Sequence, residues 1–227
     1  MSRRCPECSA KPAWALSDGR WKCRRCGTRY RYRTAWDAQR ISGREKNRLL
    51  EFFVLGVPAY RLRFRMPLSP STIERFYRIA RLALAEEQGI TCGEVEVQDG
   101  PLSLAVFLEQ GQIRLWPERS ALPGVANADC RESCPSANAV IELQDERLAL
   151  RRPPVASGAV DGIENFWSFA NHWLNSYRGM QRKNLPFYLA EICFRYNHRE
   201  QDLFPLLNRI LRTTPLDRIV SRVGPDR

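Results

Sequence analysis

Two pairs of cysteines near the start of the chain have the spacing of a metal site. Cys5 and Cys8 form one C-x2-C pair, Cys23 and Cys26 form the second, and 14 residues separate them. Each pair belongs on a tight turn that aims two thiolates at one point, and two such turns make the tetrahedral sulfur site that Zn²⁺ prefers. Redox C-x-x-C motifs instead occur singly in a thioredoxin-like context. We therefore expect a structural zinc ribbon over residues 1–36, folded by its metal because so short a segment cannot stabilise itself.

Basic side chains gather around the second cysteine pair, and aromatic residues alternate with them. Arginines suit the phosphates of a nucleic acid. The aromatic residues Trp21, Tyr30 and Tyr32 could stack on bases, but we favour the interpretation that they form the small core of the ribbon. The arginines expected to contact phosphates here are Arg24, Arg25, Arg29, Arg31 and Arg33.

The positive charge of the chain lies entirely in its first part. The 227 residues carry a formal charge of +11, and residues 1–90 hold 20 Lys or Arg against 8 Asp or Glu. Residues 91–227 hold 16 against 17, which leaves them close to neutral. A cationic surface that serves solubility alone would not normally be segregated in this way. Double-stranded DNA is the expected partner of the first part, because Lys and Arg contacts with phosphates release condensed counterions.

Residues 43–88 have the periodicity of helices. Apolar residues recur at helical spacing over 45–56, a second short helix is expected over 58–65, and a third over 71–87. Ser71 and Glu74 have the spacing of a capping box at the start of the third helix. Its expected buried stripe is Ile73, Phe76, Ile79, Ala80 and Ala83, with Arg75, Arg78 and Arg81 on other faces.

These proportions predict a helix-turn-helix whose last helix reads the major groove. Ser71, Thr72 and Arg75 would then face base edges, and Arg61, Arg63 and Arg65 would contact phosphates. A helical bundle with a solvated basic face is the alternative. The adjoining ribbon and the local charge favour the DNA-binding interpretation.

After residue 90 the pattern changes to that of strands and then helices. Strands are expected over 95–98 and 102–116, the latter folded back at Gln110 and Gly111, with one more near 139–143. Helices are expected over 162–177, 186–197 and 202–212. Residues 91–215 are thus expected to form one mixed α/β domain.

The C-terminal segments carry a family resemblance. The runs VDGIENFWSFANHWLNSYRGM (160–180) and RKNLPFYLAEICFRYNHR (182–199) resemble the end of zinc-ribbon insertion-sequence DDE transposases of the ISXO type. GEVEV (93–97) resembles the strand that leads into the first catalytic aspartate of that family. The resemblance implies an RNase H-like fold, with two carboxylates on strands and one on a helix, that holds two divalent ions for DNA cleavage and strand transfer.

The acidic positions depart from the family pattern. Gln98 stands where the first aspartate is expected, and a neutral amide cannot bridge two cations. Asp99 is one residue further on and would point to the other face of a strand unless a bulge realigns it. Asp129 is the candidate for the second aspartate, with a loop residue that caps a turn as the alternative. Glu164 matches the catalytic glutamate best, although it could simply be a favourable charge in a first helical turn.

The sequence thus predicts a multidomain α/β protein: a zinc β-ribbon, a helix-turn-helix, and a reduced RNase H-like domain with C-terminal helices. We expect a DNA-binding, transposase-like protein whose strand cleavage is lost or impaired. It would act alone, as a homo-oligomer, or in a hetero-oligomer with an intact transposase. The alternatives are an active transposase, with Mg²⁺ held by Asp99, Asp129 and Glu164, and a non-catalytic subunit of a larger nucleoprotein complex. No run of about 18 apolar residues, signal peptide or lipidation motif is present, so a cytoplasmic, nucleoid-associated location is expected.

Overall fold

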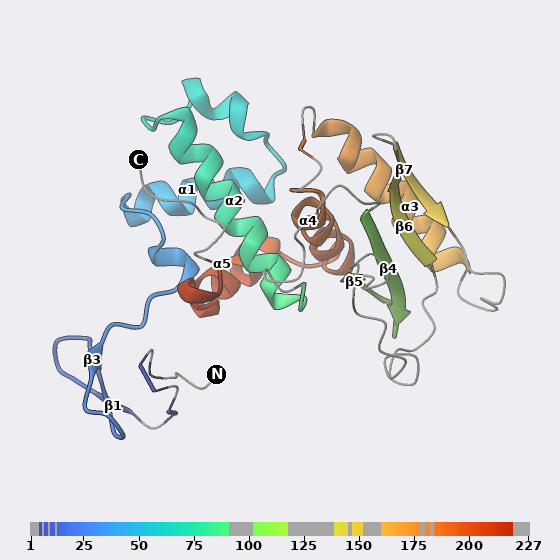
Figure 1. Ribbon diagram of the computed structural model, residues 1–227. Coiled ribbons are helices and arrows are strands. Elements are labelled where there is room, and N and C mark those ends of the chain that lie inside the picture. The colour runs from blue at the N-terminus through green and yellow to red at the C-terminus, as the bar shows by residue number, and fades with distance from the viewer. Residues whose placement is uncertain are drawn as a thin grey trace.

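The computed structural model describes residues 5, 7–8, 10–11, 13–90, 102–117, 139–144, 147–151, 160–177, 180–181 and 184–219. It contains a small antiparallel sheet at the N-terminus, a helical body, and a second sheet beside that body (Figure 1). The expected mixed α/β architecture is confirmed. The strands and helices, in chain order, are β1 (Ala13–Ala15), β2 (Trp21–Cys23), β3 (Arg29–Tyr30), η1 (Ala35–Asp37), α1 (Gly43–Val54), η2 (Ala59–Phe64), α2 (Pro70–Glu87), β4 (Leu102–Glu109), β5 (Gln112–Pro117), β6 (Ala139–Gln144), β7 (Arg147–Arg151), α3 (Val160–Ser176), α4 (Leu185–Asn197), α5 (Leu203–Thr213) and η6 (Leu216–Arg218).

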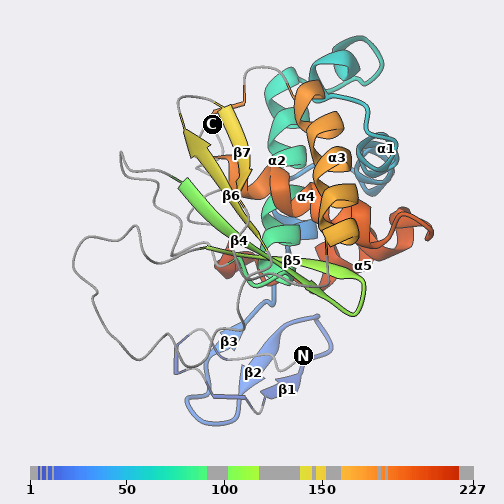
Figure 2. The same ribbon diagram turned by 90° about the vertical axis from the view of Figure 1, so that its right-hand side faces the viewer.

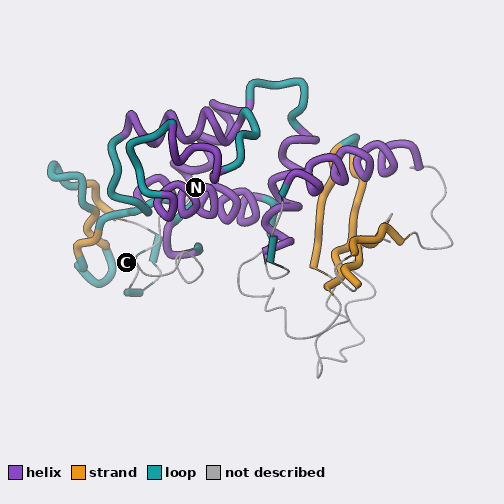
Figure 3. The backbone as a smooth tube through the Cα atoms, turned by 90° about the horizontal axis from the view of Figure 1, so that it is seen from above, coloured by secondary structure: helices purple, strands orange, loops and turns teal. Residues whose placement is uncertain are grey.

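The N-terminal sheet has the order β1-β2-β3, and both of its strand pairs are antiparallel. It lies at one end of the molecule, and the second sheet lies at the other (Figures 1 and 3). The segment that follows it is tied to the C-terminal part of the chain. The N–H of Ala35 donates to the carbonyl of Thr214 at 2.9 Å, and the N–H of Leu216 donates to the carbonyl of Arg33 at 3.0 Å. The base of the ribbon is thereby attached to the end of α5.

Helix α1 begins with a capping box in which Ser42 and Glu45 bond each other's backbone N–H groups. Helix α2 begins at Pro70, and the hydroxyl of Ser69 accepts a hydrogen bond from the N–H of Thr72 at 3.2 Å. The predicted cap at Ser71 is therefore wrong by two residues. Proline is well suited to the first helical position, so the helix starts there and Ser69 caps it.

The predicted apolar stripe of α2 is buried in full, but burial extends beyond it to Tyr77, Leu82, Leu84 and Ala85. The reason is that α4 and α5 pack against α2 in addition to α1 and η2. The second half of α2 therefore lies inside a helical body assembled from both ends of the chain. Arg81, expected on a face outside the apolar stripe, is itself largely buried, and its guanidinium pairs with Glu191 of α4 at 2.7 Å.

The second sheet has the order β5-β4-β6-β7, with each neighbouring pair antiparallel. Its apolar side chains alternate, with Leu104, Val106 and Ile113 fully buried and Arg114 of β5 exposed. The predicted hairpin over 102–116 and the predicted strand near 139–143 are confirmed. The turn of that hairpin is at Gln110 and Gly111, both with positive φ. The strand expected over 95–98 lies outside the described residues.

The three C-terminal helices predicted from the sequence are confirmed as α3, α4 and α5. Helix α4 lies between α2 and the second sheet (Figures 1 and 2), and its side chains are buried on nearly every side. At its end, Asn197 binds the edge strand β5 through both atoms of its amide. Its Oδ1 accepts from the N–H of Ile113 and its Nδ2 donates to the carbonyl of Ile113, each at 2.8 Å. Among the described helices, none combines the length and the apolar character needed to cross a membrane.

Candidate metal centre and nucleic-acid interface

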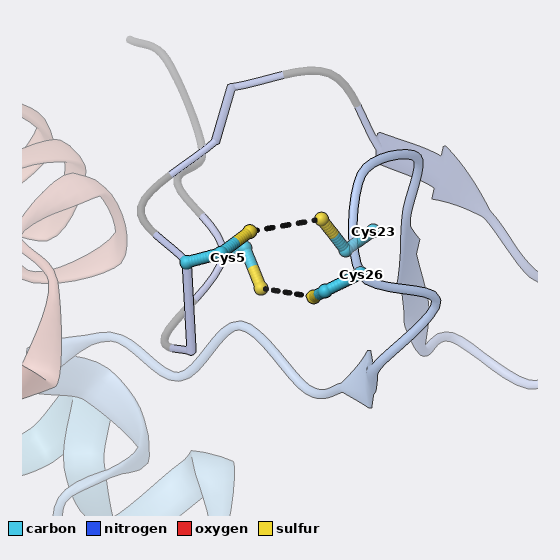
Figure 4. A group of neighbouring side chains, drawn as sticks. Cys5, Cys23 and Cys26 are labelled. Carbon is cyan, nitrogen blue, oxygen red and sulfur yellow. Dashed lines mark hydrogen bonds between the residues drawn. The ribbon is translucent and has the colours of Figure 1, made fainter.

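The four cysteines of the two C-x2-C pairs converge on one point (Figure 4). Their Sγ atoms all lie within 4.8 Å of one another, and the Cys5–Cys26 and Cys8–Cys23 pairs are 3.5 Å apart. Four sulfurs at about 2.3 Å from a tetrahedral zinc ion are separated by roughly 3.8 Å. A disulfide would need an S–S distance of about 2.05 Å. The arrangement fits a zinc ion and excludes a disulfide.

The backbone positions the second cysteine pair. Gly27 adopts a φ of 72°, a backbone conformation that is strained for residues with a side chain. Its N–H donates to the carbonyl of Cys23 at 3.1 Å. The N–H of Arg25 points at the Sγ of Cys23 from 3.3 Å. On the other pair, the N–H of Cys5 donates to the carbonyl of Ala10 at 2.9 Å. Both turns therefore aim their sulfurs at the same point.

Among the four clustered sulfurs, the pKa values of Cys8 and Cys26 are shifted in opposite directions. Hydrogen bonds from the side chain and backbone of Thr28 lower the pKa of Cys26 to about 6. The backbone N–H of Ala10 favours the thiolate of Cys8, yet burial and the three neighbouring sulfurs outweigh it and raise the pKa of Cys8 to about 12. Four thiolates this close repel one another, and a divalent cation removes that repulsion. Within the described ranges, no other group of three or more His, Cys, Asp or Glu residues could hold a metal.

The ribbon presents a basic surface with an exposed aromatic residue. Trp14 is 48% exposed, and the Arg24 guanidinium lies 5.3 Å from its ring centroid. Lys22, its partner across the β1–β2 ladder, lies 6.0 Å from the same centroid. Sequence reasoning missed Trp14, although the pairing of the two strands would have placed it opposite Lys22. The five arginines predicted to contact phosphates are all exposed: Arg24, Arg25, Arg29, Arg31 and Arg33.

A second basic surface lies on η2, at the opposite end of the N-terminal half from the ribbon (Figures 1 and 2). Its arginines Arg61, Arg63 and Arg65, for which the sequence predicts phosphate contacts, are all exposed. Two aromatic residues, which the prediction did not include, alternate with them: Tyr60 is 60% exposed and Phe64 is 84% exposed. The Arg63 guanidinium lies 4.5 Å from the Phe64 ring. This short helix therefore displays a continuous mixture of cationic and aromatic groups.

The residues predicted to read bases lie at the N-terminal end of α2. Ser71 is exposed, whereas Thr72 and Arg75 are partly buried. The Ser69 hydroxyl lies 2.9 Å from that of Ser71 and 2.8 Å from that of Thr72. Because the second half of α2 is buried, only its first turns are accessible to a partner. The base-reading role of these three residues stays a prediction.

A buried ionic network, which sequence reasoning also missed, joins four helices of the body. Glu191 on α4 accepts hydrogen bonds from Arg81 of α2 at 2.7 Å, from Arg195 at 2.8 and 2.9 Å, and from the hydroxyl of Tyr177 at 2.8 Å. Arg195 also donates to the carbonyls of Phe53 and Val54 at the end of α1. Two arginines share one carboxylate here, and the Arg81 side chain, 12% exposed, is held inside this network and not on the exposed basic surfaces.

The expected acidic site is only partly described. Gln98, Asp99 and Asp129 lie outside the described residues, as do Cys92, Cys130 and Cys134. Glu164 is the fifth residue of α3 and is exposed.

No protein family, curated protein or solved structure matched this chain. The four-cysteine centre and the two basic surfaces are therefore the features from which a function follows.

Proposed function

We propose that this protein binds double-stranded DNA through two surfaces, the zinc ribbon and the segment formed by η2 and the start of α2. The observation that carries the proposal is a concentration of exposed positive charge. No acidic residue occurs between Asp18 and Asp37, or between Glu51 and Glu74. These two stretches contain all eight arginines predicted to contact phosphates, and all eight are exposed. Exposed cations that cluster where the sequence has no acidic residue favour binding to a polyanion.

The zinc ion has a structural role in this proposal. Bound to Cys5, Cys8, Cys23 and Cys26, it would supply no reaction chemistry and would hold the two turns of the ribbon together. Arg24 and Arg25 lie between two of these ligands, so the same bonds that fold the ribbon also fix where these two cations project. Loss of the metal is expected to weaken DNA binding through loss of this fixed geometry.

We further propose that residues 91–215 derive from an RNase H-like transposase domain whose cleavage activity is lost or impaired. Support comes from the resemblance of 160–180 and 182–199 to ISXO-type transposases and from Gln98 in place of the first aspartate. A neutral amide cannot replace a carboxylate that bridges two Mg²⁺ ions. DNA cleavage or strand joining by the purified protein with Mg²⁺ or Mn²⁺, abolished by Glu164→Gln, would overturn this part of the proposal.

The DNA-binding part is tested by fluorescence anisotropy with a labelled duplex over a range of salt concentrations. Two variants lose the same charge: Arg63→Ala/Arg65→Ala on η2, and Arg114→Ala/Arg209→Ala on exposed positions of the other half. Each phosphate contact contributes about 0.9 to the slope of log K against log salt. The first variant is expected to reduce the slope by roughly 1 to 2, and the second to leave it unchanged. Wild-type binding that does not depend on salt, or an equal loss in both variants, would overturn the assignment.

A further inference from the structure

A cavity of about 430 Å³ lies beside the basic helix η2. Its wall is formed by the end of α1, by η2, by α2, by the end of α3 and by α4. Four tyrosines line it beside polar and charged side chains. They are Tyr60, Tyr77, Tyr177 and Tyr188.

The polar groups of two of these tyrosines are already bound within the protein. The Tyr77 hydroxyl donates to the carbonyl of Val57 at 2.8 Å, and the Tyr177 hydroxyl donates to Glu191. The Tyr177 and Tyr188 rings contact each other, with centroids 4.7 Å apart. Tyr77 is only 3% exposed, so the 60% exposed ring of Tyr60 is the aromatic surface that this wall offers an occupant most freely.

The charged residues of the wall balance one another. Arg81 lies 4.0 Å from the Tyr188 ring and is paired with Glu191, and the other two charges are those of Arg78 and Glu74. Two cations and two anions therefore line the cavity; Arg195, which shares Glu191, is 4% exposed, does not line it, and donates its other hydrogen bonds to the carbonyls of Phe53 and Val54. The wall also contains the amide side chains of Gln181 and Asn184, which can both donate and accept hydrogen bonds. A flat, neutral aromatic group with a polar edge suits such a wall better than an anion does.

The surface beside the cavity has the opposite character. Arg61, Arg63 and Arg65 give η2 three exposed positive charges, and Tyr60 of the same helix belongs both to this surface and to the cavity wall. An occupant that matches both parts must join a neutral aromatic group to an anionic chain. A nucleotide within a nucleic-acid strand has this chemistry.

We propose that the cavity binds an unpaired nucleobase of a DNA strand whose phosphates contact the arginines of η2. This inference rests on the proposed DNA-binding function and adds a preference for DNA that contains an unpaired base. A second copy of this chain, or an apolar peptide, would leave the three arginines without a counter-charge. Stacking on Tyr60 and its neighbours would hold the base, and Phe64, 84% exposed beside Arg63, would contact the next base along the strand.

The test compares two duplexes of the same sequence, one fully paired and one with a single extrahelical 2-aminopurine. Anisotropy is expected to show roughly 5- to 150-fold tighter binding of the second duplex, the range that stacking of one base confers. The 2-aminopurine fluorescence is expected to fall on binding as the base stacks. Tyr60→Ala should lose both effects, and Tyr60→Phe, which keeps the ring, should retain them. Leu55→Ala is the matched control, because Leu55 is 74% exposed nearby but does not line the cavity.

The outcomes separate this inference from the function on which it rests. Equal, salt-dependent binding of the two duplexes would overturn the cavity assignment and leave DNA binding intact. Binding of neither duplex would overturn both. If Tyr60→Ala changes the sedimentation of the protein and not its preference between the duplexes, the cavity is an interface between copies of the chain and the inference is wrong.

Discussion

Replacing Glu191 with glutamine is expected to destabilise the helical body strongly. The carboxylate is 1% exposed, and it accepts hydrogen bonds from Arg81, Arg195 and Tyr177. Glutamine keeps the size of the side chain but removes the charge that both arginines face. The variant would therefore bury two guanidinium groups without their counter-charge.

The size of the effect follows from this burial. Removing one partner of a buried ion pair typically costs about 3–5 kcal/mol in the free energy of unfolding, because the remaining charge is left desolvated. For a chain of this length, each kcal/mol lowers the melting temperature by roughly 2–4 °C. A fall of about 6–20 °C is therefore expected. Glu200→Gln is the control, because Glu200 is 85% exposed and lies 3.9 Å from Arg199, a pair worth at most about 1 kcal/mol.

The same carboxylate gives the destabilisation a defined pH dependence. Burial raises the pKa of Glu191, but the charges of Arg81 and Arg195 outweigh it, so the net shift is below the ordinary value of glutamate. A group whose pKa is lowered on folding adds stability above its unfolded pKa of about 4.3, and that stability is lost as the pH falls through the folded pKa. The difference between wild type and Glu191→Gln should thus be full at neutral pH and shrink under acid conditions.

Thermal unfolding followed by circular dichroism measures both effects. Wild type, Glu191→Gln and Glu200→Gln would be compared at several pH values. A melting temperature for Glu191→Gln equal to that of Glu200→Gln at neutral pH would refute the reasoning. So would a difference that grows as the pH is lowered.

Three further changes test other contacts. Cys23→Ser should abolish the binding of zinc, which atomic emission measures as one ion per chain in the wild type, and should unfold the ribbon. Gly56→Ala should lower the free energy of unfolding, measured with denaturant, by about 1–3 kcal/mol, because the φ of Gly56 is 71° and the new Cβ would lie 2.6 Å from the Trp173 ring. Gly43→Ala is the control: its Cβ would meet open space, so the free energy of unfolding should be unchanged or higher. Asn197→Leu should cost roughly 1–3 kcal/mol and speed hydrogen exchange along β5, because both backbone groups of Ile113 lose their partners; unchanged exchange there would contradict the proposed attachment.

Local patterns predicted the elements and the metal ligands well. The cysteine spacing identified all four residues that converge, and the apolar periodicity located α1, α2 and the three C-terminal helices. The hairpin at Gln110 and Gly111 was predicted because a turn dipeptide separates two alternating apolar runs. Each of these signals lies within a short window of the sequence, where spacing alone carries the information.

What the sequence did not predict depends on contacts between distant segments. The burial of Arg81 was not predicted, because nothing within α2 indicates that Glu191, 110 residues later, pairs with it. Tyr60 and Phe64 were not singled out, because an aromatic residue in a short helix is more often core than surface. The cavity beside η2 is built from five elements, and no pattern within any one of them predicts it.

Hydrogen exchange of the full-length, zinc-loaded protein with and without a DNA duplex tests the central proposal most directly. Slower exchange on DNA binding is expected in the ribbon over residues 20–33 and in residues 59–75, which contain η2 and the start of α2. Residues 102–117 and 139–151 of the second sheet should be unaffected. No change on addition of DNA, or protection confined to that sheet, would contradict the proposal that the N-terminal arginines form the DNA-binding surfaces.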